Sequence, residues 1–279
     1  MHETKEYWSM TEGVFNCLFD KERTEAFAKA IQNTVKEGDV VVDMGTGSGI
    51  LAMLAAQAGA KKVYAIEFDE NNYRNLEKVF KVNGFDQIVL LNEDVRSVEI
   101  PEKVDVIIGE MIATGLIEEQ QIQAMNNILK YTNLGCKTLL KKYTNYIDCV
   151  YNKDQYYGLQ FPIVRYEYSG ESELESWPLT GKESYSVTDF SKITSEEERV
   201  VDKTLNLVAI KDGKINGIRI SSETEFSDGT KFWGSFAYSY PIILPVEDVE
   251  VKEGDRIQVK ISYVLCGGFN NLKYSLNKD

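Results

Sequence analysis

The chain has 279 residues, of which 44 are Asp or Glu and 31 are Lys or Arg, so its formal net charge is −13. An acidic surface repels phosphate backbones, which makes nucleic acid a disfavoured partner. The length is sufficient for one large domain or two modest ones.

The cysteine and histidine content argues against several kinds of site. The four cysteines show no C-x-x-C spacing, which indicates reduced thiols and a cytoplasmic protein. The only histidine is His2, so we expect neither a metal site built on His and Cys nor histidine-dependent catalysis. No apolar run reaches about 18 residues, and the first residues lack a signal-peptide core, so we expect no membrane partner.

Residues 1–38 are predicted to be helical and loop-like, and the segment from residue 39 to residue 131 alternates between strand and helix. Phe27, Ala30 and Ile31 lie at helical spacing in the first segment. The later predicted elements are a helix closed by Gly59, a helix capped by Asp69 that ends near Gly84, a strand Val104–Ile108 and a helix Leu116–Tyr131. This βαβα order predicts a parallel sheet.

A glycine-rich turn within this segment is the most informative feature of the chain. The β-branched run Val40–Val42 leads to Asp43, and three glycines then alternate at Gly45, Gly47 and Gly49 before an apolar helical pattern begins. This order predicts a strand, a tight turn and a helix N-terminus with free N–H groups. Because glycines let the backbone approach a ligand closely, the sequence predicts the nucleotide-facing turn of an α/β sheet.

The glycine spacing distinguishes two kinds of nucleotide site. A dinucleotide fingerprint would read G-x-G-x-x-G, whereas here position 50 is Ile and the third glycine is Gly49. The pattern D-x-G-x-G-x-G resembles the first motif of class I S-adenosylmethionine methyltransferases. The resemblance implies that Asp43, Gly45, Gly47 and Gly49 bind S-adenosylmethionine. A plain glycine-rich turn and a degenerate dinucleotide site are the alternatives.

Two further acids follow the turn along the chain. A second predicted strand ends at Glu67, about 20 residues after the first glycine, where an acid accepts hydrogen bonds from ribose hydroxyls. A third strand, Gln87 to Leu91, leads to Asp94 and Val95. The resemblance implies that Asp94 faces the adenine amino group and that Val95 lies against the adenine ring. An ordinary solvated strand end is the alternative for each acid, and their order along the chain favours binding.

From about residue 138 the pattern changes to alternating, aromatic-rich segments. The predicted strands are Tyr143–Tyr151, Thr204–Ile210, Gly217–Ile220, Arg256–Val264 and Leu272–Leu276. The segment Lys211–Lys214 predicts a hairpin turn. We therefore expect an α/β chain, with a helical cofactor lid (1–38), a Rossmann-like domain (39–137) and an antiparallel β-barrel-like substrate domain (138–279).

Two glutamates define a second candidate site. Glu110 follows a buried strand, at the sheet edge where ligands bind, and Glu119 lies nine positions later. The Asn/Asp-Pro-Pro-aromatic tetrad that is typical of base-amine methyltransferases is absent. The pair resembles the double-glutamate loop of protein arginine methyltransferases, which implies that both glutamates are catalytic. The alternative is a pair of exposed acids near a helix N-terminus, where negative charge is favourable without any function.

The resemblance to protein arginine methyltransferases extends over most of the chain. Asp20 to Thr24 looks like that family's D-x-x-R-T element, which implies that Arg23 binds the cofactor carboxylate. Tyr7 and Trp8 fall at its aromatic N-terminal motif, and Trp233 at its Thr-His-Trp loop. The resemblance therefore implies substrate-binding roles for these three aromatic residues.

The combined motifs predict an S-adenosylmethionine-dependent N-methyltransferase that acts on a cationic nitrogen, with arginine of a protein or peptide as the first choice. Two carboxylates can clamp a guanidinium by charge-assisted bonds and stabilise the positive charge that develops on the acceptor. The alternatives are a methyltransferase of small-molecule or peptide amines on the same scaffold and a non-catalytic cofactor-binding paralogue. The expected partner is a protein, peptide or small cationic acceptor, and an oligomer is compatible with the resemblance.

Overall fold

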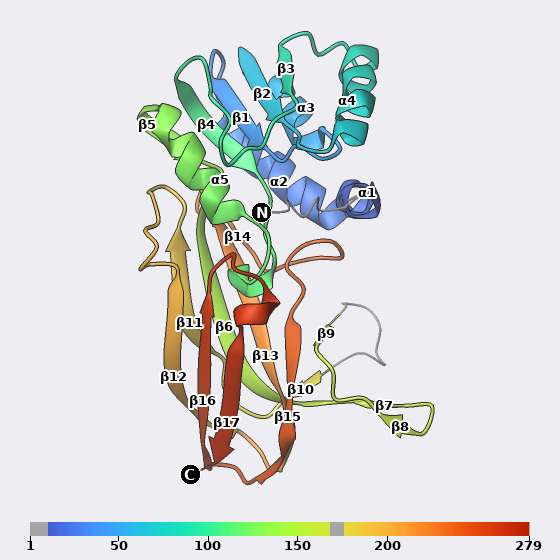
Figure 1. Cartoon of the computed structure of the whole chain (residues 1–279), viewed down its shortest axis with the longest axis vertical. Helices are drawn as coiled ribbons and strands as arrows, with labels where there is room; N and C mark the ends of the chain where they lie inside the picture. Colours follow the sequence, from blue (N-terminus) through green and yellow to red (C-terminus); the bar gives the residue numbers. More distant parts are fainter. Residues whose placement is uncertain (1–10, 168–175, 279) are drawn as a thin grey trace, which may run out of the picture.

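The computed structural model describes residues 11–167 and 176–278, and it shows a parallel sheet with its helices stacked on a set of antiparallel sheets (Figure 1). The five-stranded parallel sheet has the order β3-β2-β1-β4-β5. Its strands are β1 (Val40–Met44), β2 (Lys62–Ile66), β3 (Ile88–Leu91), β4 (Val104–Gly109) and β5 (Thr132–Thr138). The helices are α1 (Thr11–Phe19), α2 (Lys21–Thr34), α3 (Ile50–Gln57), α4 (Glu70–Val82) and α5 (Gln121–Ile128). Within the described residues, no helix combines the length and apolarity needed to cross a bilayer.

The position of β1 determines where a ligand can bind. All five residues of β1 are buried, as expected for a central strand covered on both faces. The strand pairs with β2 on one side and with β4 on the other. The strand order therefore reverses next to β1, and the carboxyl ends of β1 and β4 form the crevice where open α/β sheets bind ligands.

The predicted local signals for the helices are present. The Asp69 side chain accepts a hydrogen bond from the Asn72 N–H at 2.8 Å and caps α4, while Gly84 follows the helix with φ +71°. In α2 the buried face includes Phe27, Ala30 and Ile31. The sequence patterns therefore identified the caps and the buried faces of these helices correctly.

The predicted helix Leu116–Tyr131 is wrong over its first five residues. Only Gln121–Ile128 is α-helical, with 3₁₀ turns at Thr114–Leu116 and Leu129–Tyr131. Leu116 and Glu119 have left-handed φ values of +50° and +58°. Because these values are incompatible with a right-handed helix, the segment that carries Glu119 is a loop.

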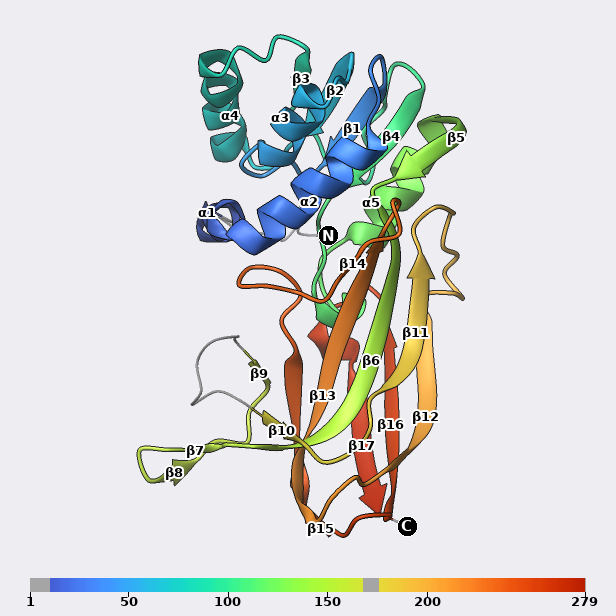
Figure 2. The same ribbon diagram turned by 180° about the vertical axis from the view of Figure 1, so that it is seen from behind.

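The antiparallel part consists of two sheets that close into a barrel-like unit (Figure 2). The larger sheet has the order β10-β6-β13-β15-β9, with β11 paired to β6 and β14 paired to β13, and the smaller sheet has the order β12-β16-β17. β11 lies beside β12, and β15 lies beside β17. The strands of the larger sheet are β6 (Leu140–Asn152), β9 (Arg165–Tyr166), β10 (Ser176–Pro178), β11 (Glu183–Asp189), β13 (Gly213–Phe226), β14 (Lys231–Phe232) and β15 (Ile242–Val251). Those of the smaller sheet are β12 (Val200–Val208), β16 (Arg256–Val264) and β17 (Lys273–Lys278), while β7 (Gln155–Tyr156) and β8 (Leu159–Gln160) form a separate projecting hairpin.

The predicted hairpin at Lys211–Lys214 is also wrong. β12 pairs with β16, whereas β13 pairs with β6 and β15. The turn therefore carries the chain from one sheet to the other. A turn signal specifies a change of direction, and the pairing partner is chosen by long-range packing.

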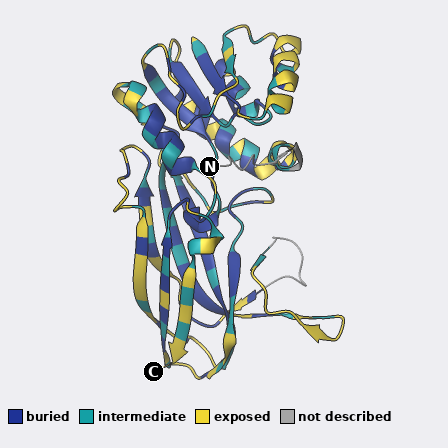
Figure 3. Ribbon diagram, viewed as in Figure 1, coloured by how far each residue is buried: buried dark blue, intermediate teal, exposed yellow. Residues whose placement is uncertain are grey.

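The two parts share one hydrophobic core and meet at the loop between β4 and α5 (Figure 3). Asp20, which caps α2, also accepts hydrogen bonds from the Ser235 hydroxyl and the Ala237 N–H, both at 2.6 Å. These contacts join the helical N-terminal segment to the barrel. The domain limits at residues 38 and 137 stay a proposal.

Candidate active site

The glycine-rich turn forms one wall of a cavity of about 240 Å³. Gly45 and Gly47 line this cavity with φ values of +59° and +57°. A Cβ at Gly45 would lie 3.0 Å from Cγ of Met111, which leaves little room for a side chain. Both the backbone conformation and the close packing therefore favour glycine at this position.

Glu67 lines the same cavity and ties the turn to α4. Its Oε2 accepts hydrogen bonds from the Gly47 N–H at 3.2 Å and from Asn72 Nδ2 at 2.9 Å. Its Oε1 accepts the Asp69 N–H at 2.8 Å. The carboxylate is thus fixed in the wall where the sequence places a ribose-binding acid.

Asp43 and Gly49 do not line the cavity. Asp43 is 1% exposed and accepts a hydrogen bond from the Thr46 hydroxyl at 2.6 Å, and burial raises its pKa to about 7. Gly49 caps α3 with φ +78°, and a Cβ there would lie 2.5 Å from Cε1 of Phe80. Both residues therefore stabilise the turn without lining the cavity, and direct contact of either residue with the cofactor stays a prediction.

Arg23 and Glu110 form a buried ion pair in the cavity wall. Arg23 Nε and Nη2 donate to Glu110 Oε2 at 3.1 and 2.6 Å, and Arg23 Nη1 donates to the Cys17 carbonyl at 3.2 Å. The second oxygen of Glu110 accepts the Ile112 N–H at 2.9 Å. A guanidinium has five N–H donors, and these three bonds leave two for a ligand. Both oxygens of Glu110 therefore accept hydrogen bonds from within the protein, one from Arg23 and the other from Ile112.

Glu119 lines two cavities at once. It belongs to the first cavity and to a second one of about 770 Å³. Its side chain is exposed to solvent, and its pKa is raised to about 8 by partial desolvation from the surrounding protein and by the charges of Glu110 and Glu118. Within the described residues, nothing donates a hydrogen bond to this carboxylate.

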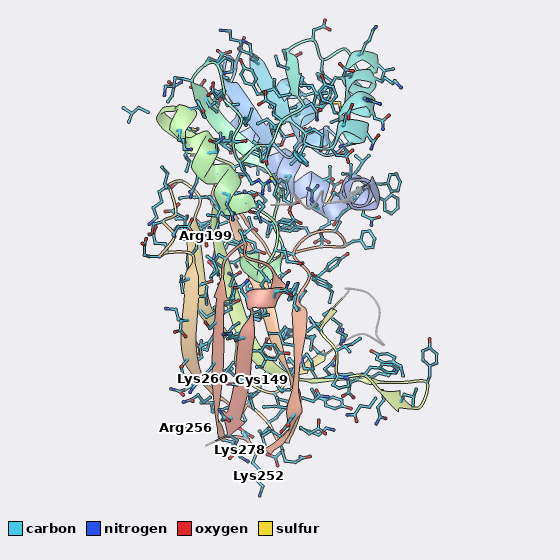
Figure 4. The ribbon with its side chains drawn as sticks, in the orientation of Figure 1. Cys149, Arg199, Lys252, Arg256, Lys260 and Lys278 are labelled. Atoms are coloured by element: carbon cyan, nitrogen blue, oxygen red, sulfur yellow. The ribbon has the colours of Figure 1, made fainter. Side chains whose placement is uncertain are left out.

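The second cavity lies between the parallel-sheet part and the barrel. Its polar lining includes Glu118, Tyr166, Ser239 and Tyr240 besides Glu119, and no lysine or arginine of the described residues lines it. Basic side chains such as Lys252, Arg256 and Lys278 lie at the far end of the barrel (Figure 4). The second cavity is therefore acidic and suited to a cation.

Asp94 and Val95 line a neighbouring cavity of about 230 Å³, which shares Gly45, Glu67 and Met111 with the first one. The Asp94 carboxylate pairs with Arg96, whose Nη2 lies 2.5 Å from Oδ2, and this hydrogen bond lowers the pKa of Asp94. The structure thus brings both residues next to the glycine turn, as the sequence order suggests. Their contact with adenine stays a prediction.

The structure describes only one of the three aromatic residues that were predicted to bind the substrate. Tyr7 and Trp8 lie outside the described residues. Trp233 is 46% exposed, packs on Tyr146 at 5.0 Å between ring centroids, and has Lys182 Nζ 4.7 Å above its ring. It lines none of the three cavities described above, so the structure does not bring it together with the two glutamates.

The sequence analysis did not single out several lining residues, among them Met111, Ala237 and Cys17. Met111 lines all three cavities, Ala237 lines two, and Cys17 lines the first. Met111 directly follows Glu110, which is a usable signal. Nothing in the sequence marks Ala237 or Cys17, because an apolar or lone thiol side chain has no pattern that distinguishes a cavity wall from a core.

Comparisons with known proteins point to one family. The model "Ribosomal protein L11 methyltransferase (PrmA)" matches residues 20–146. An uncharacterized protein of Methanocaldococcus jannaschii, MJ1452, is 32% identical over 264 residues, which cover 94% of this chain and 95% of that protein. A probable protein arginine N-methyltransferase 6 of Arabidopsis thaliana is 43% identical over 106 residues, which cover 37% of this chain and 24% of that protein.

The fold also has solved counterparts. The Trypanosoma brucei PRMT1 enzyme-prozyme heterotetrameric complex with AdoHcy is similar with a TM-score of 0.79 at 19% identity, covering 95% of this chain and 92% of that chain. At this identity the similarity shows the fold, and it confirms the predicted α/β class with a following β domain.

The residues of the first cavity fit S-adenosylmethionine, which is the cofactor of this enzyme. Gly45 and Gly47 leave space beside the turn, Glu67 presents carboxylate oxygens, and Arg23 retains two N–H donors for the carboxylate of the ligand. The prediction of S-adenosylmethionine in place of a dinucleotide is thereby confirmed. The chain belongs to the family of the M. jannaschii protein and is a class I S-adenosylmethionine-dependent methyltransferase that resembles the protein arginine methyltransferases.

Proposed function

We propose that this methyltransferase transfers a methyl group to a cationic nitrogen, with the guanidinium of a protein or peptide arginine as the first choice. The observation that carries the proposal is the position of Glu119. Its carboxylate lines both the cavity of the glycine turn and the acidic second cavity, and it has no donor within the described residues. A cationic acceptor in the second cavity would satisfy this carboxylate and relieve its repulsion with Glu110 and Glu118.

The chain's own residues then have separate tasks. The bound cofactor supplies an electrophilic methyl group on sulfur. Glu119 binds and orients the acceptor, and Glu110 completes the clamp while remaining bonded to Arg23 through one oxygen. Two charge-assisted bonds hold one nitrogen of a guanidinium and leave another free to attack, and the proton that this nitrogen loses on methylation would pass to the Glu119 carboxylate. Both carboxylates stabilise the positive charge that develops on the acceptor.

The structure also bears on what the acceptor can be. The second cavity is larger than the first, at about 770 against 240 Å³, and it opens between two parts of the chain. The opening between the two parts favours an extended segment of a protein or peptide, whereas the volume by itself lies within the range of small-molecule sites. The alternatives are a small-molecule or peptide amine as acceptor, and a paralogue that binds the cofactor without turnover. An oligomer likewise stays a proposal, and sedimentation velocity tests it directly.

The decisive experiment compares three variants in methyl transfer and in cofactor binding. Glu110→Gln and Glu119→Gln remove the charges of the clamp and retain the size of the side chains, and Glu196→Gln, on the exposed surface, is the matched control. Methyl transfer from radiolabelled S-adenosylmethionine is measured on an arginine peptide and on the same peptide with lysine. Calorimetry with S-adenosylhomocysteine measures cofactor affinity.

We expect each clamp variant to lower methyl transfer by about two orders of magnitude or more, the scale of losing one preorganised charge. Cofactor affinity should change little in Glu119→Gln, and Glu196→Gln should behave as the unmodified enzyme. Full activity of both clamp variants would show that the glutamates are not catalytic. Transfer to the lysine peptide alone would favour the amine alternative, and binding of S-adenosylhomocysteine without turnover on any acceptor would favour the non-catalytic one.

A further inference from the structure

The loop that carries Glu119 has an unfavourable backbone conformation. Within five residues, Gly115, Leu116 and Glu119 adopt φ values of +72°, +50° and +58°. A left-handed φ at a residue with a side chain is strained and persists only where the surroundings determine it. The contacts that hold this loop therefore decide where the Glu119 carboxylate lies.

Three buried barrel side chains converge on the backbone of Gly115. The Tyr263 hydroxyl donates to the Gly115 carbonyl at 2.7 Å, and Asn145 Nδ2 donates to the same oxygen at 3.3 Å. The Gly115 N–H donates to the Ser222 hydroxyl at 3.1 Å. Asn145, Ser222 and Tyr263 are 0%, 1% and 2% exposed. Both backbone polar groups of Gly115 are thus held from inside the barrel.

The three side chains are themselves held by neighbours on other strands. Ser222 donates to Asn145 Oδ1 at 2.8 Å, and Asn145 Nδ2 also donates to the Ser186 hydroxyl at 2.8 Å. The Tyr185 and Tyr263 hydroxyls lie 2.9 Å apart. Because the one hydroxyl proton of Tyr263 goes to Gly115, Tyr185 donates in this pair. Each hydroxyl and amide group in this network therefore has a defined donor or acceptor role, which restricts the orientations of the side chains.

The next two residues of the loop are held by a second segment of the barrel. The Cys266 N–H donates to the Leu116 carbonyl at 2.6 Å, and the Gly268 N–H donates to the Ile117 carbonyl at 2.8 Å. Arg199 Nη2 donates to the Leu265 carbonyl at 3.0 Å, and this side chain lies at the end of the barrel nearest α5 (Figure 4). These backbone bonds end two positions before Glu119, and on its other side Gln120 Nε2 donates to the Cys266 carbonyl at 3.3 Å.

We propose that Tyr263, Asn145 and Ser222 are positioning residues that hold Gly115 and thereby fix the Glu119 carboxylate at the junction of the two cavities. The inference rests on the proposed role of Glu119 in binding the acceptor. According to this proposal, the barrel contributes to catalysis by positioning Glu119 as well as by lining the second cavity. None of the three residues lines either cavity.

A pair of tyrosine variants tests the proposal. Tyr263→Phe removes the bond to Gly115 and preserves the shape of the side chain. Tyr185→Phe is the matched control, because it removes a hydroxyl from the same buried network and leaves the bond to Gly115 in place. Ser222→Ala provides a second, smaller change at the N–H of Gly115. Each variant is measured for kcat and KM with an arginine peptide, for thermal midpoint and for S-adenosylhomocysteine affinity.

Tyr263→Phe and Ser222→Ala should each lower kcat roughly tenfold, the size of one lost hydrogen bond. Their cofactor affinity should stay within about twofold, because the glycine turn is untouched. Tyr185→Phe should retain its kcat even if its thermal midpoint falls as far as that of Tyr263→Phe. In Tyr263→Phe the pH midpoint for acceptor binding should also move downwards, since a loosened Glu119 gains solvent.

Unchanged kcat in both Tyr263→Phe and Ser222→Ala would overturn the inference, and so would equal losses of kcat in Tyr263→Phe and Tyr185→Phe, because the network would then be purely structural. The Glu119→Gln variant separates this failure from failure of the proposed function. If Glu119→Gln abolishes transfer while Tyr263→Phe and Ser222→Ala do not lower it, the clamp is right and the positioning role is wrong. If Glu119→Gln remains active, the proposed function itself fails.

Discussion

Protonation of Glu119 should control the affinity of this enzyme for a cationic acceptor. Burial and the neighbouring carboxylates Glu110 and Glu118 raise the pKa of Glu119 to about 8, and Arg23 opposes this shift. A carboxyl is neutral below its pKa, so the charge that binds a cation is lost as the pH falls through about 8. At pH 7 about one tenth of the protein would carry the charge, against about nine tenths at pH 9. The affinity for an arginine peptide should therefore weaken about tenfold between these values.

The assay is calorimetric titration of an arginine peptide into enzyme saturated with S-adenosylhomocysteine, between about pH 6.5 and 9.5. This ligand is chosen because its sulfur is uncharged and adds no charge beside Glu119. The arginine side chain stays protonated throughout this range, so the midpoint reports the enzyme. Besides Glu110, Glu118 and Arg23, the titratable groups within electrostatic reach of Glu119 are Cys17, Tyr143 and Cys266, and burial raises the pKa of each above this range.

Two results would refute this reasoning. An affinity that is constant over the whole range would show that Glu119 either does not titrate there or does not touch the acceptor. A midpoint near pH 8 that persists in Glu119→Gln would assign the titration to another group. An amine acceptor, in contrast, would lose its own charge only towards pH 10 and above, which separates the two acceptor classes.

Two further variants test the packing of the glycine turn and the wall of the first cavity. Gly49→Ala should destabilise the fold by about 1–3 kcal/mol more than Gly84→Ala. Both glycines have positive φ, but only a Cβ at Gly49 would collide, at 2.5 Å from Cε1 of Phe80. Chemical denaturation measures the difference, and equal losses of stability in the two variants would contradict the packing argument. Glu67→Gln should weaken S-adenosylhomocysteine binding by about 1–3 kcal/mol through lost charge-assisted bonds, and calorimetry that finds unchanged affinity would remove Glu67 from the cofactor site.

Local sequence rules predicted the cofactor half of the molecule well. A strand that ends at an acid and three alternating glycines defines the turn between β1 and α3, because positive φ at Gly45 and Gly47 is a property of those residues themselves. The cap at Asp69 and the acid at Glu67 depend on neighbours a few residues away. Short-range interactions of this kind leave a pattern in the sequence.

In the part of the chain that would bind the acceptor, two predictions from local sequence patterns were wrong. The segment after residue 115 reads as a helix, yet buried barrel side chains more than a hundred residues away hold Gly115, and Glu119 has a left-handed backbone conformation. A turn signal at residues 211–214 reads as a hairpin, yet β12 finds its partner in β16. Both errors arose because competing long-range contacts outweighed the local preference.

The sequence by itself therefore determined the fold class, the cofactor and the two candidate glutamates, since each of these depends on short motifs in a fixed order. Only the tertiary structure decided what surrounds each glutamate. It pairs Glu110 with Arg23, which lies 87 residues earlier in the chain, and it places Glu119 at the junction of two cavities, where none of residues 11–167 and 176–278 donates a hydrogen bond to its carboxylate. The physical reason is that charge pairing and burial depend on distances in space, and those distances are set by packing between elements that are far apart in the sequence.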